Sequence, residues 1–180
     1  KDITEQKKAE EKIKSLAYYD QLTNLSNRTL FLDRLKIAIS AAKRYKRIFA
    51  LLFIDIDNFK IINDALGHFI GDKLIREISK IFLKSLRAED SVFNIKYSKS
   101  NSKKIDTVSR IGGDEFTILL SEIKEPKDAS IVVKRIQKEL LKSFIIDGNT
   151  INIIESFFMN ESKLMQKNLN FPHFSSDRTT

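Results

Sequence analysis

The chain of 180 residues contains no cysteine, no tryptophan and only two histidines. Without cysteine it forms neither a disulfide nor a thiolate metal site, which is compatible with a cytoplasmic protein. The histidines, His68 and His173, stand far apart in the sequence and do not indicate a metal site. No apolar run approaches the ~20 residues of a membrane-spanning helix, and none has the pattern of a signal peptide. We therefore expect no membrane segment in this chain.

Basic residues outnumber acidic ones by 32 to 24, which gives a formal net charge of +8. Such a balance occurs in proteins that bind nucleic acid or anionic membranes. The lysines are dispersed, however, and no basic strip is interleaved with aromatic residues. A polyanionic small ligand is a sufficient explanation of the charge, so nucleic-acid binding is not expected.

The segment RIGGDEF at residues 110–116 is the most informative feature of the sequence. Apolar residues flank Gly112 and Gly113, so the glycines are expected in the turn of a β-hairpin, where they take positive φ without steric cost. Glycines also let a phosphate or sugar approach the backbone, and the carboxylates of Asp114 and Glu115 are suited to hold Mg²⁺ or accept a proton. Taken alone, an acidic surface turn would be the simpler interpretation, but a second segment argues against it.

The second segment covers residues 49–72. An apolar run from Phe49 to Ile54 is typical of a strand buried on both faces. Asp55 and Asp57 follow it, two residues apart and so on one face. One strand–helix unit then carries a lysine, an asparagine and a further aspartate, namely Lys60, Asn63 and Asp72. A carboxylate for a hard cation, a cation for phosphate and an amide for a base edge are the groups that a nucleoside triphosphate–Mg²⁺ site requires.

Together with YYDQLTNLSNR at 18–28 and the leader DITEQKKAEEKI, these segments resemble the GGDEF family of diguanylate cyclases in order and spacing. The resemblance covers roughly residues 15–150. It implies an enzyme of bacterial signalling that condenses two GTP into cyclic di-GMP and releases two pyrophosphates. It also implies an α+β fold, with a ferredoxin-like β-α-β-β-α-β core after an N-terminal signalling helix.

The resemblance further implies a role for each matching residue. Asp55 and Asp114, with the backbone carbonyl of Ile56, would hold Mg²⁺ or Mn²⁺. Lys60 would neutralise triphosphate charge during catalysis. Asp114 and Glu115 would be catalytic, with Glu115 assisting deprotonation of the 3′-hydroxyl, although their division of labour stays open. The substrate-binding residues would be Asn63 and Asp72 at the guanine edge, Gly112 and Gly113 against the nucleotide, and Phe59.

Partners follow from the same resemblance. Each domain would hold one GTP, so catalysis would need a homodimer whose two sites face each other. The chain starts at Lys1 rather than Met, and its first residues resemble the junction after a PAS sensor domain, so we expect a C-terminal fragment of a PAS-linked sensor protein. The stretch 1–17 is either a signalling helix paired with its copy or a solvated linker. The domain is expected to be cytoplasmic, whether or not the full-length protein is membrane-anchored.

The predicted elements follow the order of that fold. Helices are expected over 5–18, 29–45 and 70–86, near Asn58, and from Pro126 to about Ser143, with the hairpin over 107–121. A strand over 150–154 is expected to complete the sheet. The GGDEF domain as a whole is expected over 18–155.

One departure from the family pattern lies before the hairpin. Arg87 and Asp90 match the RxxD motif through which family members bind cyclic di-GMP in product inhibition, but this motif normally lies only a few residues before the glycines. The polar, lysine-rich stretch that follows is expected to be a surface insertion at about 91–106. Lys103 and Asp106 keep the usual spacing of the motif, but a lysine loses the bidentate recognition of arginine.

The other departure is the C-terminal end. After a strand the family continues with small residues, a hairpin and a helix whose cations clamp the triphosphate. Here Phe157 and Phe158 stand where small residues are expected, and 156–180 is expected to be an atypical tail with disordered character, from a truncated or frame-shifted gene or from divergence. This end favours an alternative function, a catalytically impaired module that binds GTP or cyclic di-GMP, or dimerises, to regulate a partner. The retained Asp114 and Glu115 favour the enzyme.

Overall fold

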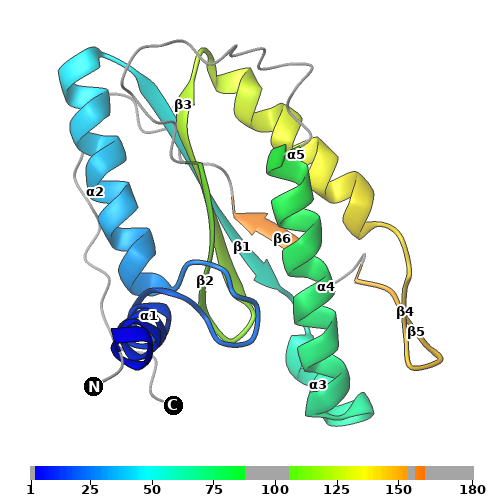
Figure 1. The fold of residues 1–180 in the computed structure, drawn as a ribbon. Helices are drawn as coiled ribbons and strands as arrows, with labels where there is room; N and C mark the ends of the chain where they lie inside the picture. Colours follow the sequence, from blue (N-terminus) through cyan, green and yellow to red (C-terminus); the bar gives the residue numbers. More distant parts are fainter. Residues whose placement is uncertain (1–2, 88–105, 154–156, 161–180) are drawn as a thin grey trace, which may run out of the picture.

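The computed structural model describes residues 3–87, 106–153 and 157–160. Its centre is a four-stranded sheet in the order β2-β3-β1-β6, with every neighbouring pair antiparallel (Figure 1). The strands are β1 (Ile48–Ile56), β2 (Thr107–Gly112), β3 (Glu115–Ile123) and β6 (Phe157–Asn160). This is the strand arrangement of a ferredoxin-like core, so the predicted α+β fold is confirmed.

Helices cover both faces of the sheet (Figure 1). Helix α2 (Arg28–Tyr45) packs on one face, and α4 (His68–Arg87) and α5 (Pro126–Leu140) pack on the other. Alternate residues of β1 point to opposite faces, so that Leu51 joins the cluster under α2 and Leu52 joins the larger cluster under α4 and α5. Because both faces are covered, the strand is apolar at nearly every position, as its sequence predicts.

Four further elements surround this core. Helix α1 (Ile3–Tyr18) precedes the domain and contacts α2, while α3 (Phe59–Leu66) joins β1 to α4. Strands β4 (Phe144–Ile146) and β5 (Asn149–Ile151) form a separate hairpin. Among the described residues, no helix combines the length and the apolar character that crossing a membrane would need.

Local sequence signals set where two of the helices begin. Asn27 caps α2, since its Oδ1 accepts a hydrogen bond of 3.1 Å from the N–H of Leu30. Pro126 stands in the first turn of α5, where its missing N–H has no intrahelical role. The buried carboxylate of Asp128 accepts hydrogen bonds from the N–H groups of Lys124 (2.9 Å) and Glu125 (3.1 Å). The carboxylate thus satisfies two backbone N–H groups just before α5 begins.

The fourth strand of the central sheet differs from the prediction. Residues 150–151 belong to β5, which pairs with β4 and not with the central sheet. The place beside β1 is taken by β6, in which Phe157 is the Cα partner of Ile56. The apolar pattern at 150–154 indicates a strand but carries no information on its partner. Strand β6 falls within the predicted tail, whose residues 161–180 lie outside the described part of the chain.

Candidate functional site

The segment RIGGDEF connects β2 and β3 as a hairpin turn. Gly112 and Glu115 are paired across the hairpin, and Gly113 and Asp114 form the turn between them. Gly113 has a φ of +49°, a left-handed conformation that glycine adopts without a clash of Cβ. A Cβ built on either glycine would meet no atom within 4 Å. The space beside the turn backbone is therefore open to a ligand.

Four carboxylates lie at this end of the sheet. Asp55, near the end of β1, is the Cα partner of Glu115 on β3. Burial, and then the like charges of Asp114 and Asp57, raise the pKa of Asp55 above its ordinary value, against the opposing effect of a hydrogen bond from the N–H of Ile56. A divalent cation would relieve this local excess of negative charge.

After β1 the chain turns sharply into α3. Asn58 adopts a left-handed conformation with a φ of +58°, and its side chain makes no capping hydrogen bond to the helix. Lys60, in the first turn of α3, is exposed. The start of a helix carries partial positive charge, so this turn and the lysine together suit an anionic group.

Asn63 and Asp72 lie on α3 and α4, two helices that contact each other. The side-chain amide of Asn63 lies directly against buried Gly71, since a Cβ built on Gly71 would be 1.9 Å from Asn63 Oδ1. That oxygen is buried and has no hydrogen-bond partner within the described residues. Asp72, the next residue after Gly71, is exposed. Asn63 thus packs against the helix turn that carries Asp72, and Asp72 is open to solvent beside it in the sequence.

Comparison with known proteins identifies the family to which these segments correspond. The pattern of the family described as "Diguanylate cyclase, GGDEF domain" matches residues 17–99 and 95–157. The matched ranges include the turn, the end of β1 and the contact between α3 and α4. The chain belongs to the GGDEF family. The resemblance recognised in the sequence is thus confirmed.

Individual relatives agree with this assignment. The bifunctional diguanylate cyclase/cyclic di-GMP phosphodiesterase MucR of Pseudomonas aeruginosa is 38% identical over 149 residues, which are 83% of this chain and 19% of MucR. The diguanylate cyclase TpbB of the same organism is 34% identical over 137 residues, 76% of this chain and 28% of TpbB. The chain thus spans only a small part of either relative. The solved GGDEF domain of TpbB has a TM-score of 0.63 at 33% identity, covering 79% of this chain and 72% of that one.

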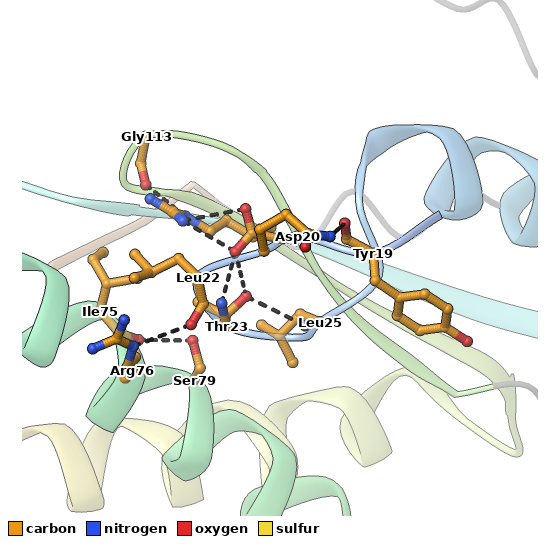
Figure 2. A network of polar contacts seen from close by, with 11 residues as sticks. Tyr19, Asp20, Leu22, Thr23, Leu25, Ile75, Arg76, Ser79 and Gly113 are labelled. Carbon is orange, nitrogen blue, oxygen red and sulfur yellow. Dashed lines mark hydrogen bonds and ion pairs between the residues drawn. The ribbon is translucent and has the colours of Figure 1, made fainter. Parts of the chain in front are cut away.

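A salt bridge supports the GGDEF turn. Arg110 donates from Nε to the carbonyl oxygen of Gly113 (2.8 Å) and from Nη1 to Oδ1 (3.1 Å) and Oδ2 (3.2 Å) of Asp20. Asp20 Oδ1 also accepts from the N–H (2.9 Å) and hydroxyl (2.7 Å) of Thr23, as Figure 2 shows. Burial alone would raise the pKa of Asp20, but the hydrogen bonds from Thr23 and Arg110 outweigh it and lower that pKa. The turn is thereby linked to the loop that follows α1.

Sequence reasoning missed the contact between Arg110 and Asp20. The two residues are 90 positions apart, so no periodicity or spacing connects them. The one sequence feature that could have indicated a role for Arg110 is its position as a cation directly before an acidic turn. The loop is also tied to α4, because Arg76 Nε donates to the carbonyl oxygen of Leu22 at 3.2 Å (Figure 2).

The other predicted site residues have varied surroundings. Phe59 is half-buried and packs against the main core, and its Cζ lies 3.2 Å from the position that a Cβ of Gly71 would take.

Within the described ranges, no three His, Cys, Asp or Glu side chains converge as a metal-binding group. Arg87 is the last residue of α4, but its side chain and Asp90 lie outside the described residues. The product-inhibition site predicted from these two residues stays a prediction.

A groove of about 990 Å³ lies between α1 and α2. Its lining includes Glu11, Tyr18, Leu30 and Lys36, and none of the predicted site residues. The groove therefore belongs to the leader helix and not to the carboxylates of the GGDEF turn.

Proposed function

We propose that this chain is the catalytic module of a diguanylate cyclase, which joins two GTP into cyclic di-GMP and releases two pyrophosphates. The observation that carries the proposal is the position of Asp55 against the GGDEF turn, where Glu115 is its Cα partner and the charge of Asp114 contributes to its raised pKa. Two relatives with diguanylate cyclase in their names, MucR and TpbB, support the same reaction.

Asp55 and Asp114, with the backbone carbonyl of Ile56, are the proposed ligands of Mg²⁺ or Mn²⁺. Oxygen donors are the ligands these ions prefer, and the repulsion that raises the pKa of Asp55 is relieved by a cation. The described residues hold no complete cluster of three such side chains, so the remaining ligands are assigned to triphosphate oxygens and water, as is usual for Mg²⁺. When bound, the ion would neutralise charge on the phosphates.

GTP is assigned to the surface between the turn and the start of α3 and α4. The open space beside Gly112 and Gly113 leaves room for the nucleotide against the backbone. Exposed Lys60 offers a cation to the triphosphate. Asn63 and Asp72 offer an amide and a carboxylate to the guanine edge, and Phe59 packs beside Gly71 from the core side.

The reaction requires two copies of the chain. The 3′-hydroxyl oxygen of one GTP attacks the α-phosphorus of the other, and the bond from that phosphorus to the bridging oxygen breaks as pyrophosphate leaves. Glu115 is the proposed acceptor of the hydroxyl proton, while Lys60 stabilises charge on the phosphates. A homodimer with its two turns facing each other follows, because each domain holds only one substrate.

Helix α1 is proposed to connect this module to an upstream PAS-like sensor, with the domain in the cytoplasm. Ile13 and Leu16 on this helix are 67% and 54% exposed. An apolar stripe on an otherwise charged helix suits pairing with the same helix of a second copy. Such pairing would bring two GGDEF domains together.

A second candidate function is a GGDEF module that binds GTP or cyclic di-GMP, or dimerises, to regulate a partner without turnover. The observation that favours it is strand β6. Phe158 is the Cα partner of Asp55, at a place where the family resemblance calls for small residues, and the family match ends at residue 157. The neighbour of a proposed metal ligand is therefore atypical.

Product formation from GTP with Mg²⁺, resolved by chromatography, tests the proposal. The wild-type chain is expected to make cyclic di-GMP, and Asp114→Ala is expected to make none. Asp33→Ala, an exposed change on α2, controls for loss of a surface acid and should leave the rate unchanged. A wild-type chain that binds GTP but makes no product would support the second function. A chain that makes no product, binds neither GTP nor cyclic di-GMP and does not dimerise would contradict both functions.

A further inference from the structure

We propose that Gly71 is a specificity-determining positioning residue, which holds the amide of Asn63 with its oxygen inward and its NH₂ group toward the base. The inference rests on the proposed function, in which Asn63 and Asp72 recognise guanine. Gly71 touches no nucleotide atom in this scheme and acts through Asn63.

The packing of α3 against α4 leaves no room for a side chain at position 71. A Cβ there would be 1.9 Å from Oδ1 and 3.0 Å from Cγ of Asn63, and 3.2 Å from Cζ of Phe59. The first distance is far shorter than any contact between a carbon and an oxygen that are not bonded. The observed conformation of Asn63 therefore exists only because residue 71 is glycine. Glycine in the interior of a helix makes the helix less stable than alanine does. The packing of Asn63 explains why a glycine nevertheless stands at this position in α4.

The same contact decides which end of the amide is enclosed. Oδ1 of Asn63 is buried and accepts no hydrogen bond within the described residues. The hydrogen that stands in place of Cβ on Gly71 points at this oxygen, and a Cα–H group is a weak donor that suits an oxygen. An inward NH₂ group would instead bury two donors with no acceptor. Because Asn63 as a whole is only half-buried, its NH₂ end is the one presented to a ligand.

In the proposed guanine site, Asn63 therefore offers a donor and Asp72, the residue after Gly71, offers an acceptor. The Watson–Crick edge of guanine carries an acceptor, O6, next to donors on N1 and N2, and so complements this pair. Adenine carries an NH₂ group where guanine has O6 and lacks the N1 proton, so two donors would face each other at Asn63. A site that leaves buried polar groups unpaired with the wrong ligand discriminates strongly. Gly71 thus contributes to the choice of GTP over ATP.

The test uses Gly71→Ala, Asn63→Ala and the double variant in the chain of 180 residues. Gly71→Ala alone is expected to lower the midpoint of thermal unfolding by at least about 2–4 °C. In the Asn63→Ala background the midpoint should fall much less, because the clashing amide is gone, alanine favours the helix and only the contact of 3.2 Å with Phe59 Cζ remains. Competition of GTP and ATP against a fluorescent GTP analogue, with Mg²⁺ present, should show the preference for GTP reduced at least ~10-fold in Gly71→Ala.

Lys80→Ala, a change on the exposed surface of α4, is the control and should alter neither readout. If Gly71→Ala changes the midpoint equally in the wild type and in Asn63→Ala, the proposal that Gly71 positions Asn63 is overturned. An unchanged preference for GTP in Gly71→Ala would overturn the role in specificity, whatever the midpoints show. A wild-type chain that binds GTP and ATP alike, or neither, would contradict the guanine site itself. The thermal comparison would still decide whether Gly71 positions Asn63.

Discussion

The guanidinium of Arg110 bridges the carboxylate of Asp20 and the backbone carbonyl of Gly113, at distances of 3.1 Å and 2.8 Å. The side chains of Arg110 and Asp20 are only 13% and 23% exposed. A planar guanidinium binds its acceptors in fixed directions, so the position of the GGDEF turn depends on the loop that follows α1.

Replacing Arg110 with lysine tests that dependence. Arg110→Lys keeps the positive charge, but a lysine cannot bond Asp20 and Gly113 in the same fixed geometry. We expect the free energy of unfolding to fall by about 1.5–3 kcal/mol, the value of hydrogen bonds to charged groups, and cyclic di-GMP formation to fall at least ~10-fold. Urea unfolding and product chromatography measure the two effects.

Arg34→Lys is the matched control for Arg110→Lys. Arg34 on α2 donates to Thr107 Oγ1 at 2.7 Å and has no contact with the turn, so its replacement should leave product formation within about twofold of the wild type. Full activity in Arg110→Lys would show that the turn holds its position without the salt bridge.

The lowered pKa of Asp20 predicts a dependence of stability on pH. A carboxyl whose pKa is lower in the folded than in the unfolded chain stabilises the fold at pH values above the unfolded pKa of about 3.9. This contribution is lost as the pH falls through the folded pKa. Asp20→Asn should therefore lower the free energy of unfolding at pH 7 and make it less steeply dependent on pH below about pH 4.

Urea unfolding at a series of pH values from about 7 to 3 measures this effect of Asp20. Asp33→Asn, on the exposed surface of α2, controls for the loss of one negative charge. If the free energy of unfolding changes with pH in the same way in the wild type and in Asp20→Asn, the ionisation of Asp20 is not linked to folding.

Local features of the fold could be predicted from the sequence because each depends on neighbouring residues. The apolar run at 49–54 predicted a strand buried on both faces, and β1 is covered by helices on both. Pro126 marked the start of α5, and the glycines of RIGGDEF marked the hairpin turn. In the site, the family resemblance directed attention to Asn63 and Asp72, which lie on the two contacting helices α3 and α4, and their role at the guanine edge stays a prediction.

Contacts between distant segments could not be predicted in this way. The pattern at 150–154 indicated a strand, but the choice between β4 and the central sheet depends on tertiary packing. The pairing of Arg110 with Asp20 has no local signature either. No local pattern assigns a packing role to Gly71, which lies inside α4 and whose importance comes from the amide packed against it. Propensity describes the conformation of a segment and not its partner.

Asp55→Asn is expected to stabilise the fold while abolishing turnover. Burial and the charges of Asp114 and Asp57 raise the pKa of Asp55, so this carboxyl lowers stability as the pH rises through the interval between the unfolded and folded pKa values. Asparagine has nearly the same shape without the charge. Because Asp55 is only partly buried and solvent screens much of its charge, the gain at pH 7 without Mg²⁺ should be only a few tenths of a kcal/mol, and it should vanish at about pH 3.

Urea unfolding at both pH values and the cyclase assay test Asp55→Asn together. Asp64→Asn, an exposed change on α3, shows whether any loss of an acid has the same effect on stability. Turnover by Asp55→Asn at the wild-type rate would contradict its assignment as a metal ligand. Lower stability at pH 7 would contradict the repulsion among the carboxylates.

Magnesium should stabilise the wild-type chain more than Asp55→Asn. A ligand that binds only the folded state adds about 1.4 kcal/mol at ten times its dissociation constant, which raises the midpoint of thermal unfolding by roughly 3–6 °C in a chain of this size. The titration is done with a non-hydrolysable GTP analogue present, because the triphosphate is expected to complete the coordination. Asp33→Asn should respond to Mg²⁺ as the wild type does. An equal rise in Asp55→Asn would place the ion elsewhere on the chain or on the nucleotide alone, and the end of β1 would then have no part in binding it.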